Sequence, residues 1–529
     1  MTSRTISVYL LKEEVADYQD ALKDNIAFTR IDPKEGDDET GAALFIKPTL
    51  KNPPRWQALL SGTFDLNQVD LGVKSSSAVL FLTVEDRKFA LAFGHGHAML
   101  DDAKVVHDFG LEASLSMVEP EQLRNIDVMR PEAMALRKRH QVGRSSRMEE
   151  FEIDQLLDVV RSITGRSSDQ DFAKKVTGTT AFKITANLEY ADLANKCARA
   201  LELYESDAYQ ENFALIDNLR SEKDPAVIAR LDDALLDALK NREFDRISLS
   251  PPEIIEHREI VGFKYRGYAG DEIKPDLDIA DYFAVYPDQD ALDLTTLKRH
   301  KVHVQFEDDE SARAIWKLYK CIIFDCVIDD RQYILTEGNW YRIDTAFRDR
   351  TNEFFRNSVV EMDLPSAGAT EFERDYCARV AQGEGVYLFD RQTFRVPGET
   401  ARYELCDLLF NERVLLHIKP YKNGSGALSH LFRQGEMAGE LFCREPEFRR
   451  AARAHLETLN ADAVGLIPDE PPDARQYTLR FGIIAKRRAQ GGGFDIPFFS
   501  KVSFQHAARR LSAYGYRVDV CFIEREAGA

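Results

Sequence analysis

The pattern of apolar and polar positions divides the first half of the chain into a strand-rich part and a helical part. Apolar runs typical of strands occupy residues 5–11, 78–84 and 88–93, and the last two flank a hairpin turn at Glu85-Asp86-Arg87. Apolar residues recur at helical spacing over residues 12–22, 148–163, 188–204 and 225–241. We therefore expect an α/β domain over residues 1–125 and a mainly helical region over residues 126–245.

A second break comes at Ser250-Pro251-Pro252, a sequence typical of the boundary between elements. Strand-like runs follow at residues 259–265, 282–286, 301–306, 321–327, 332–336 and 340–343. A helix is expected over residues 310–319. This mixture of elements predicts an α+β region over residues 246–363.

The last part of the chain follows a linker-like sequence, LPSAGA, at residues 364–369. Its expected elements are, in order, helix 370–382, strands 385–390, 402–409 and 413–419, helices 427–442 and 447–459, strand 477–485, helix 500–514 and strand 516–523. This order predicts an α/β domain over residues 364–529. The whole chain is therefore expected to be an α/β multidomain protein with α+β N-terminal parts and a helical middle.

Net charge and cysteine spacing argue against several classes of protein. A net charge of −19 argues against a protein that coats nucleic acid non-specifically, although residues 481–517 form a locally basic segment. The seven cysteines show no CxxC spacing, which indicates a reducing compartment and no zinc site. Because no signal sequence or membrane-length apolar run occurs either, we expect a cytoplasmic protein without a membrane partner.

Candidate chemistry concentrates on a hairpin within residues 403–419. His417 and Lys419 are two positions apart, so they share one face of the second strand, and Asp407 can lie across from them. An Asp, a second metal-binding side chain and a Lys on one face can hold a metal ion and a phosphate. Strict alternation places Glu404 on the opposite face from Asp407, so Glu404 needs a bulge to contribute.

The segment after this hairpin is typical of an anion site. Residues 421–426 (YKNGSG) lead into a helix, whose free N–H groups favour phosphate, so we expect contacts from Lys422, Gly424, Ser425 and Gly426. On that helix His430 and Gln434 are four positions apart and share a face. The basic pair Lys486 and Arg487, which precedes three glycines, is either a phosphate-contacting loop or a plain solvated one.

These residues together resemble the PD-(D/E)XK nuclease superfamily. Asp407 matches the family's Asp on the second strand, His417-Ile418-Lys419 occupies the (D/E)XK triplet, and Gln434 matches a helix Gln of some branches. Glu371 or Glu373 matches an optional acid on the first helix. The resemblance implies a restriction-endonuclease-like domain with Asp407, His417, Lys419 and Gln434 as catalytic residues, supported by Glu404, Glu373 and His430.

The resemblance also implies a cofactor and a partner. Asp407 and His417 would bind Mg²⁺, or Mn²⁺, which tolerates imidazole better, and the substrate would be nucleic acid, with DNA favoured over RNA. His417 departs from the family, which has Glu or Asp at this position. A degenerate site that only binds nucleic acid or a protein is therefore one alternative. A nucleotide-using transferase with His417 or His430 as acid or base is another.

A second resemblance extends over nearly the whole chain. The blocks that carry it, in order, are residues 6–12 (ISVYLLK), 89–100 (FALAFGHGHAML), 108–111 (DFGL), 335–341 (LTEGNWY), 403–409, 416–419, 428–435 and 497–502 (PFFSKV). They resemble an uncharacterised, sporadically distributed bacterial family. That distribution implies a role in antiviral or mobile-element defence, with a defence-system partner protein or a homo-oligomer as possible assemblies.

The His95–His97 turn and Trp340 each have a structural and a functional interpretation. His95 and His97 in Gly94-His95-Gly96-His97 could bind a metal or a ligand, although a tight turn allowed by glycine is the simpler interpretation. Trp340 could stack on a base, although packing at a domain edge is more typical. No P-loop, GxSxG or dinucleotide-binding motif occurs, which leaves ATPase, serine hydrolase and Rossmann readings without support.

Overall fold

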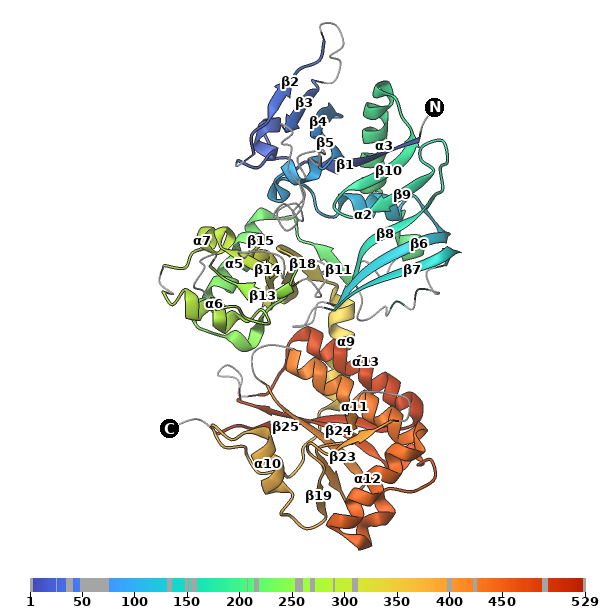
Figure 1. The fold of residues 1–529 in the computed structure, drawn as a ribbon, viewed down its shortest axis with the longest axis vertical. Coiled ribbons are helices and arrows are strands. Elements are labelled where there is room, and N and C mark those ends of the chain that lie inside the picture. Colours follow the sequence, from blue (N-terminus) through green and yellow to red (C-terminus); the bar gives the residue numbers. More distant parts are fainter. Residues whose placement is uncertain are drawn as a thin grey trace, which may run out of the picture. The chain divides into compact units, whose positions relative to one another are not determined.

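The computed structural model shows a mixed α/β chain with several antiparallel sheets, which confirms the expected α/β multidomain class (Figure 1). It describes residues 3–24, 26–34, 41–47, 76–130, 136–147, 151, 153, 159–206, 208–213, 218–252, 260–266, 272–288, 291–306, 313–396, 402–421, 426–487 and 493–526. The chain divides into two compact units, one comprising Met1–Met129, Lys138–Ile153 and Val159–Asp217, the other Arg130–Arg137, Asp154–Asp158 and Asn218–Ala529. The four domain boundaries expected from the sequence stay a prediction.

The first unit contains a ten-stranded sheet of order β2-β3-β4-β5-β1-β10-β9-β8-β6-β7. Its strands are β1 (Ser3–Leu10), β2 (Thr29–Ile31), β3 (Ala43–Lys47), β4 (Ser77–Val84), β5 (Arg87–Gly94), β6 (Val118–Arg130), β7 (Leu136–Ser146), β8 (Val159–Ser167), β9 (Lys175–Gly178) and β10 (Phe182–Asn187). Helices α2 (Phe109–Leu115) and α3 (Leu193–Glu205) pack on one face, where Val8, Ile184 and Phe109 are buried together. The short helix α4 (Gln210–Phe213) follows α3.

The expected strands at the N-terminus are confirmed, but the expected helix over residues 12–22 is wrong. Only a 3₁₀ turn, Tyr18–Ala21, forms there, with Asp17 as its cap. The backbone instead bonds to a neighbouring segment, because Lys23 N–H donates to Met99 O and Asp101 N–H donates to Ala21 O. Tertiary pairing therefore replaces the helical hydrogen bonds that the apolar spacing suggested.

The region over residues 126–245 is not mainly helical, which corrects a second expectation. Its first half supplies strands to the ten-stranded sheet, and β8 covers part of the helix expected over residues 148–163. Buried Val160 and Ile163 face the core through pairing with β6 rather than along a helix. The rest of that expected helix falls partly outside the described residues. The second half is helical as expected, with α3 and α5 (Pro225–Lys240).

The second unit begins with two antiparallel sheets, of order β11-β18-β17-β16-β12 and β13-β14-β15. Their strands are β11 (Leu219–Ser221), β12 (Ile247–Leu249), β13 (Ile260–Lys264), β14 (Lys301–Phe306), β15 (Arg313–Lys317), β16 (Ile322–Ile328), β17 (Arg331–Thr336) and β18 (Asn339–Ile343). Helices α5, α6 (Ile279–Val285), α7 (Leu294–Arg299) and α8 (Leu318–Cys321) accompany them, and α9 (Thr345–Ser358) follows.

Two expectations in this region are wrong. Residues 282–286 lie in and after helix α6, which Asp278 caps by accepting a hydrogen bond from Ala280 N–H, and not in a strand. Within the helix expected over residues 310–319, the described residues from Arg313 on instead form strand β15, which pairs with β14, and the start of the short α8. Both segments are rich in apolar residues, and periodicity alone does not separate helix from strand in such short runs.

The C-terminal part of the second unit has a five-stranded sheet of order β19-β22-β23-β24-β25 (Figure 1). The strands are β19 (Val386–Leu388), β22 (Leu408–Phe410), β23 (Val414–Pro420), β24 (Thr478–Ala485) and β25 (Arg517–Glu524). The first three pair antiparallel, and β23, β24 and β25 pair parallel. A separate pair is formed by β20 (Thr393–Arg395) and β21 (Arg402–Glu404), so the strand expected over residues 402–409 is interrupted.

Helices cover both faces of this sheet. Helix α10 (Glu373–Val380) buries Tyr376 and Cys377 against one face, together with Leu416 and Ile418 of β23. Helices α11 (Gly426–Arg444), α12 (Pro446–Leu459) and α13 (Phe498–Tyr514) pack in the core of the other face. The helices expected in this part are thus confirmed. Among all described helices, we find none whose length and apolarity would suffice to cross a bilayer.

Candidate metal centre

Three carboxylates in the C-terminal part of the second unit lie close enough to hold one metal ion. They belong to Glu373, Asp390 and Asp407, and one oxygen from each lies within 4.8 Å of the others. We call this group the carboxylate triad. Two of its members, Asp407 and Glu373, are among the residues that the sequence indicated, and Asp390 is not.

The fold brings the triad together through strand pairing. β19 and β22 are antiparallel, with Leu388 opposite Leu408, so the end of one strand lies beside the start of the other. The N–H groups of Phe389 and Asp390 both donate to the carbonyl of Asp407, at 2.8 and 3.0 Å. Glu373 is the first residue of α10, which packs on the same sheet. The triad therefore sits where two strand ends and a helix start converge.

Asp407 is the most buried member of the triad, with 6% of its surface exposed. Burial is the main cause that raises its pKa, to about 8, and the neighbouring carboxylates of Glu373, Glu404 and Asp390 raise it further. The N–H of Ile418, which donates to Asp407 Oδ2, acts in the opposite direction. Like charges this close repel one another, so a bound cation would stabilise the ionised triad.

Lys419 joins the triad at the end of β23. Its Nζ lies 3.0 Å from Glu373 Oε1, and both side chains are partly exposed. An ammonium group here offsets part of the triad's negative charge and can contact an approaching phosphate. The sequence expectation that Lys419 and Asp407 lie in one site is matched by this geometry, although their catalytic role stays a prediction.

Glu404 reaches the site because its strand is interrupted. β21 ends at Glu404 and β22 begins only at Leu408, so the strict alternation assumed from the sequence does not apply across residues 405–407. Gln434 Nε2 on α11 donates to Glu404 Oε2 at 2.9 Å. Burial raises the pKa of Glu404, and the charges of Asp390 and Glu373 raise it further while Lys419 lowers it. Glu404 and Gln434 thus form a second layer beside the triad.

His417 and His430 do not join this group. His417 is 2% exposed, and its ring packs 6.0 Å from that of Phe481 on the sheet face covered by α11 and α13. Burial lowers its pKa to about 3, and its Nε2 atom has no hydrogen-bond partner among the described residues. The metal-ligand role expected for His417 is therefore not what this geometry offers. His430 is exposed on α11.

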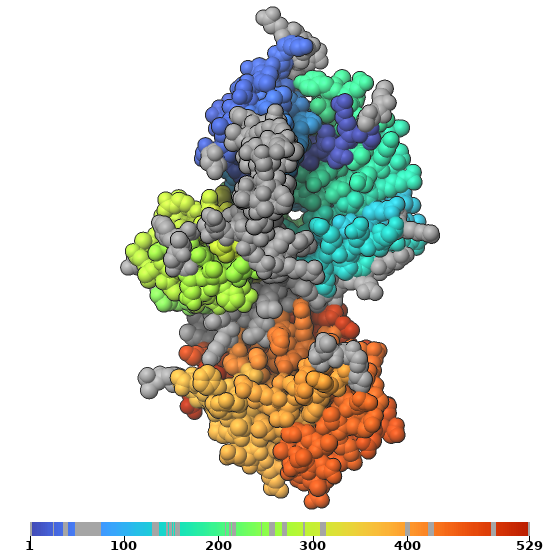
Figure 2. All heavy atoms as spheres, viewed as in Figure 1, coloured from blue at the N-terminus to red at the C-terminus, as the bar shows by residue number. Residues whose placement is uncertain are grey.

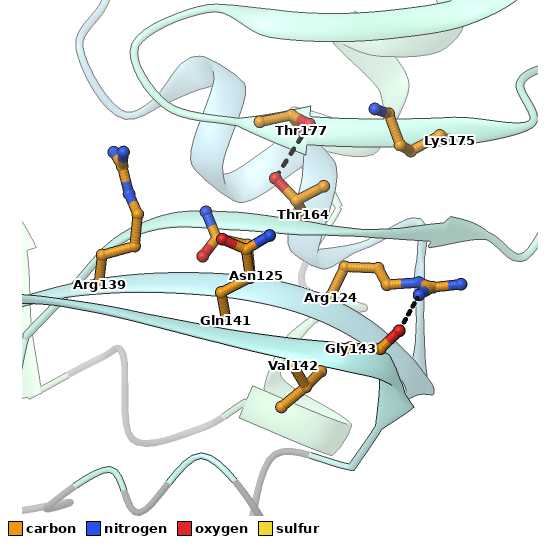
Figure 3. A pocket seen from close by; sticks show the side chains of 9 residues that line it. All are labelled: Arg124, Asn125, Arg139, Gln141, Val142, Gly143, Thr164, Lys175 and Thr177. Carbon is orange, nitrogen blue, oxygen red and sulfur yellow. Dashed lines mark hydrogen bonds between the residues drawn. The ribbon is translucent and has the colours of Figure 1, made fainter.

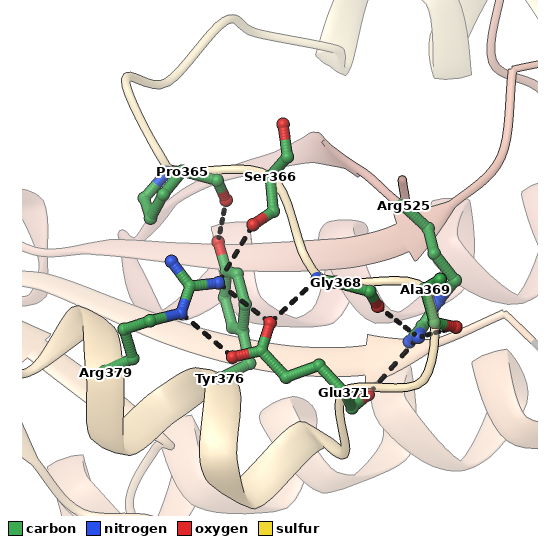
Figure 4. A network of polar contacts seen from close by, with 8 residues as sticks. All are labelled: Pro365, Ser366, Gly368, Ala369, Glu371, Tyr376, Arg379 and Arg525. Carbon is green, nitrogen blue, oxygen red and sulfur yellow. Dashed lines mark hydrogen bonds and ion pairs between the residues drawn. The ribbon is translucent and has the colours of Figure 1, made fainter. Parts of the chain in front are cut away.

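Glu371, which the sequence offered as the alternative to Glu373, takes part in a hydrogen-bond network that stabilises the fold (Figure 4). Its carboxylate accepts two hydrogen bonds from Arg379, at 2.9 and 2.8 Å, and one from Gly368 N–H. The Arg379 guanidinium is the first cause that lowers the pKa of Glu371. Arg525, which is buried, donates to the carbonyls of Gly368, Ala369 and Glu371. This network fixes the segment that leads into α10.

Substitutions of Glu371, which precedes α10, and of Glu373, its first residue, are expected to have opposite effects. We expect Glu371→Gln to lower the free energy of unfolding by about 1 kcal/mol, because it weakens a bidentate but partly exposed ion pair. Glu373→Gln is expected to change stability little and to remove a metal-induced rise in Tm. Urea unfolding and thermal melts with and without Mg²⁺ measure both effects. A metal response that survives Glu373→Gln and disappears with Glu371→Gln would contradict this assignment.

The expected phosphate contacts are only partly within the described residues. Lys422, Gly424 and Ser425 lie outside them, and Gly426 is the first residue of α11. Lys486 is exposed after β24, and Arg487 pairs with Glu524 at 3.0 Å. The basic character of this segment is thus partly neutralised by a local acid.

Trp340 is also part of a buried hydrogen-bond network. Its indole is buried and donates to Asp232, which also accepts from Lys298 and Tyr319. This arrangement agrees with packing and leaves no exposed ring for a base. His95 and His97 are exposed, with ring centroids 6.4 Å apart, and neither belongs to the carboxylate triad.

Asp390 is the site residue that sequence reasoning missed. The pattern placed it inside the strand expected over residues 385–390, where a single acid is unremarkable. A usable signal was present, because a hairpin-like order of strands brings the end of one strand to the start of the next. Acids at both of these positions, Asp390 and Asp407, would then be neighbours.

Comparison with known proteins gives a family match. A model for a family of unknown function, DUF6119, matches residues 6–524, which include residues of both units. Among curated proteins no match was found, and none was found among solved structures.

Proposed function

This chain belongs to the DUF6119 family, and we propose from the carboxylate triad that it is a metal-dependent nuclease that hydrolyses phosphodiester bonds. The observation that carries the proposal is the convergence of Glu373, Asp390 and Asp407 within 4.8 Å, with Lys419 Nζ 3.0 Å from Glu373. We further propose a role in defence against viruses or mobile elements, which rests on the sequence resemblance alone.

The donor set of the triad suits a hard divalent cation. All three side chains offer oxygen, which Mg²⁺ prefers, and no imidazole belongs to the group. The Mn²⁺ alternative drew its support from His417, so its absence from the group favours Mg²⁺. When bound, such an ion neutralises phosphate charge and lowers the pKa of a coordinated water. Lys419 can then contact a phosphate oxygen, while Gln434 holds Glu404 in place beside the triad.

The arrangement of elements supports a PD-(D/E)XK-like domain. Helix α10, strands β19, β22 and β23, helix α11 and strand β24 give the order helix, three strands, helix, strand, with the β20–β21 pair inserted after β19 and helix α12 inserted after α11. The three strands form an antiparallel meander, and β24 pairs parallel to the last of them. This order agrees with α-β-β-β-α-β, the core order of the PD-(D/E)XK superfamily that the chain resembles. In that comparison Asp390 provides the third carboxylate that His417 does not.

Cleavage assays test the proposal. We expect the full chain to cleave nucleic acid in Mg²⁺ and to lose this activity in EDTA, with single- and double-stranded DNA and RNA tried in parallel. Lys419→Met should reduce the rate about 10²–10³-fold, since it removes a cation placed for the reacting phosphate. Arg374→Met is the matched control, because Arg374 is exposed on α10 and, among the described residues, forms its ion pair with its neighbour Asp375. Cleavage that persists in EDTA, or a Lys419→Met rate equal to the control, would refute the proposal.

A further inference from the structure

One face of the ten-stranded sheet is polar where the other is buried. Register places Ser7, Lys183, Thr177, Thr164 and Asn125 side by side on successive strands from β1 to β6. A second row, two positions along each strand, contains Thr5, Thr185, Lys175 and Arg166. Since side chains alternate between faces, both rows lie on one face, opposite buried residues such as Ile6, Ile184 and Val176. We call this surface the polar sheet face.

The polar sheet face is hollowed beside these rows (Figure 3). A hollow of about 560 Å³ is lined by Arg124, Asn125, Arg139, Gln141, Val142, Gly143, Thr164, Lys175 and Thr177. The side chains come from β6, β7, β8 and β9, and all of them belong to the first unit. In the space-filling view this sheet forms part of the cyan to green surface (Figure 2). The hollow contains cations, hydroxyls and amides, and no carboxylate among its lining residues.

This surface carries several cations in a chain whose net charge is −19, and two of its arginines lie beside carboxylates. Lys175 and Lys183 are exposed, and neither forms an ion pair with any described residue. Arg139 is held by Asp127 through two hydrogen bonds, and Arg124 Nη1 donates to the carbonyl of Gly143. Arg166 lies 3.8 Å from Glu119. Lys175 and Lys183 are therefore exposed cations that no carboxylate among the described residues neutralises.

We propose that the polar sheet face binds the phosphate backbone of a nucleic-acid strand. Lysines together with threonine hydroxyls and side-chain amides are the groups that contact phosphate oxygens. Their arrangement in two rows over several strands suits a series of phosphates better than one isolated anion. The lining has no aromatic ring on which a base could stack, so the contact is with the backbone and independent of sequence. This binding site lies apart from the carboxylate triad and does not depend on cleavage.

Fluorescence anisotropy with the full chain tests this proposal. The probes are labelled single-stranded DNA, double-stranded DNA and single-stranded RNA of mixed sequence, in EDTA so that no metal-dependent cleavage occurs. We expect Lys175→Ala/Lys183→Ala to weaken binding at least about tenfold, since two charge-assisted contacts are lost. Over about 0.05–0.2 M salt, the slope of log affinity against log salt should fall by about two.

Two control variants make the result specific. Lys175→Arg/Lys183→Arg keeps both charges and should retain binding, which separates loss of charge from loss of fold. Arg299→Ala/Lys301→Ala removes two exposed cations from the second unit and should leave binding unchanged. Equal affinity of the alanine variant and the wild type would overturn the proposal. Binding of inorganic phosphate by a protein that binds none of the three oligonucleotides would also overturn it, because the site would then bind small anions.

Discussion

Asp390→Asn is expected to abolish metal-dependent cleavage, with a loss of about 10³-fold or more. Asp390 supplies one of three carboxylates within 4.8 Å, and the amide that replaces it is a neutral and weaker ligand for Mg²⁺. Loss of a metal that stabilises the reacting phosphate removes several kcal/mol, which corresponds to this factor. The prediction is sharp because the sequence motif assigns no role to Asp390. Its measurement is the initial rate on the best substrate at saturating Mg²⁺.

A second readout separates metal binding from chemistry. Mg²⁺ should raise the Tm of the wild type, since a ligand that binds only the native state stabilises it, and should not raise the Tm of Asp390→Asn. Asp375→Asn is the matched control, because Asp375 is an exposed acid on α10 outside the triad. It should keep both the metal response and the rate. If Asp390→Asn cleaved as fast as this control, Asp390 would be only a surface acid and the triad would be incorrect.

The sequence indicated some residues of the candidate site and missed another. Asp407 and Lys419 could be predicted because Asp407 directly precedes the first strand of a short hairpin and Lys419 lies on the second, so that spacing determines proximity. Glu373, at the start of α10, was indicated only by the resemblance, as an optional acid on the first helix. Asp390 was not indicated, because its position depends on how β19 pairs. A single sequence without an alignment contains no direct record of such pairing.

Side-chain alternation along a strand excluded Glu404 from the site and included His417, and the structure differs from both predictions. Alternation excluded Glu404, yet the strand is interrupted after this residue, and Gln434 binds it beside the triad. Alternation included His417, yet its ring lies in the apolar layer next to Phe481. Alternation determines the face of a side chain only while the strand is continuous. It does not determine whether that face meets solvent or a helix.

The fold errors have a related cause. The hairpin of β4 and β5 was predictable because its strands are regular and Glu85 and Asp86 adopt the positive φ that a tight turn requires. The segments over residues 12–22 and 148–163 showed helical spacing, but pairing with distant parts of the chain determines the structure of residues 12–22 and of the described residues 159–163. Long-range pairing overrides weak local preference, so the ten-stranded sheet was seen only in part.

His417→Glu is expected to destabilise the protein by about 3–5 kcal/mol and not to increase cleavage. On the sequence motif alone this change would restore a missing metal ligand. In the structure it places a carboxylate in the buried layer beside Phe481, without a cation among the described residues to pair with it. The native imidazole tolerates this place because burial keeps it neutral, with its pKa lowered to about 3. Urea unfolding and the Mg²⁺-dependent rate measure the two effects.

His417→Leu is the comparison that isolates the charge. Leucine has a similar size and no polar atom, and the imidazole Nε2 has no hydrogen-bond partner among the described residues. Its free energy of unfolding should therefore equal that of the wild type or exceed it by about 1 kcal/mol. Cleavage by His417→Leu should also equal that of the wild type, since the carboxylate triad is unchanged. Two results would show that residue 417 takes part in the metal site. One is a lower cleavage rate of His417→Leu at unaltered stability, and the other is a higher cleavage rate of His417→Glu in a protein that is as stable as the wild type.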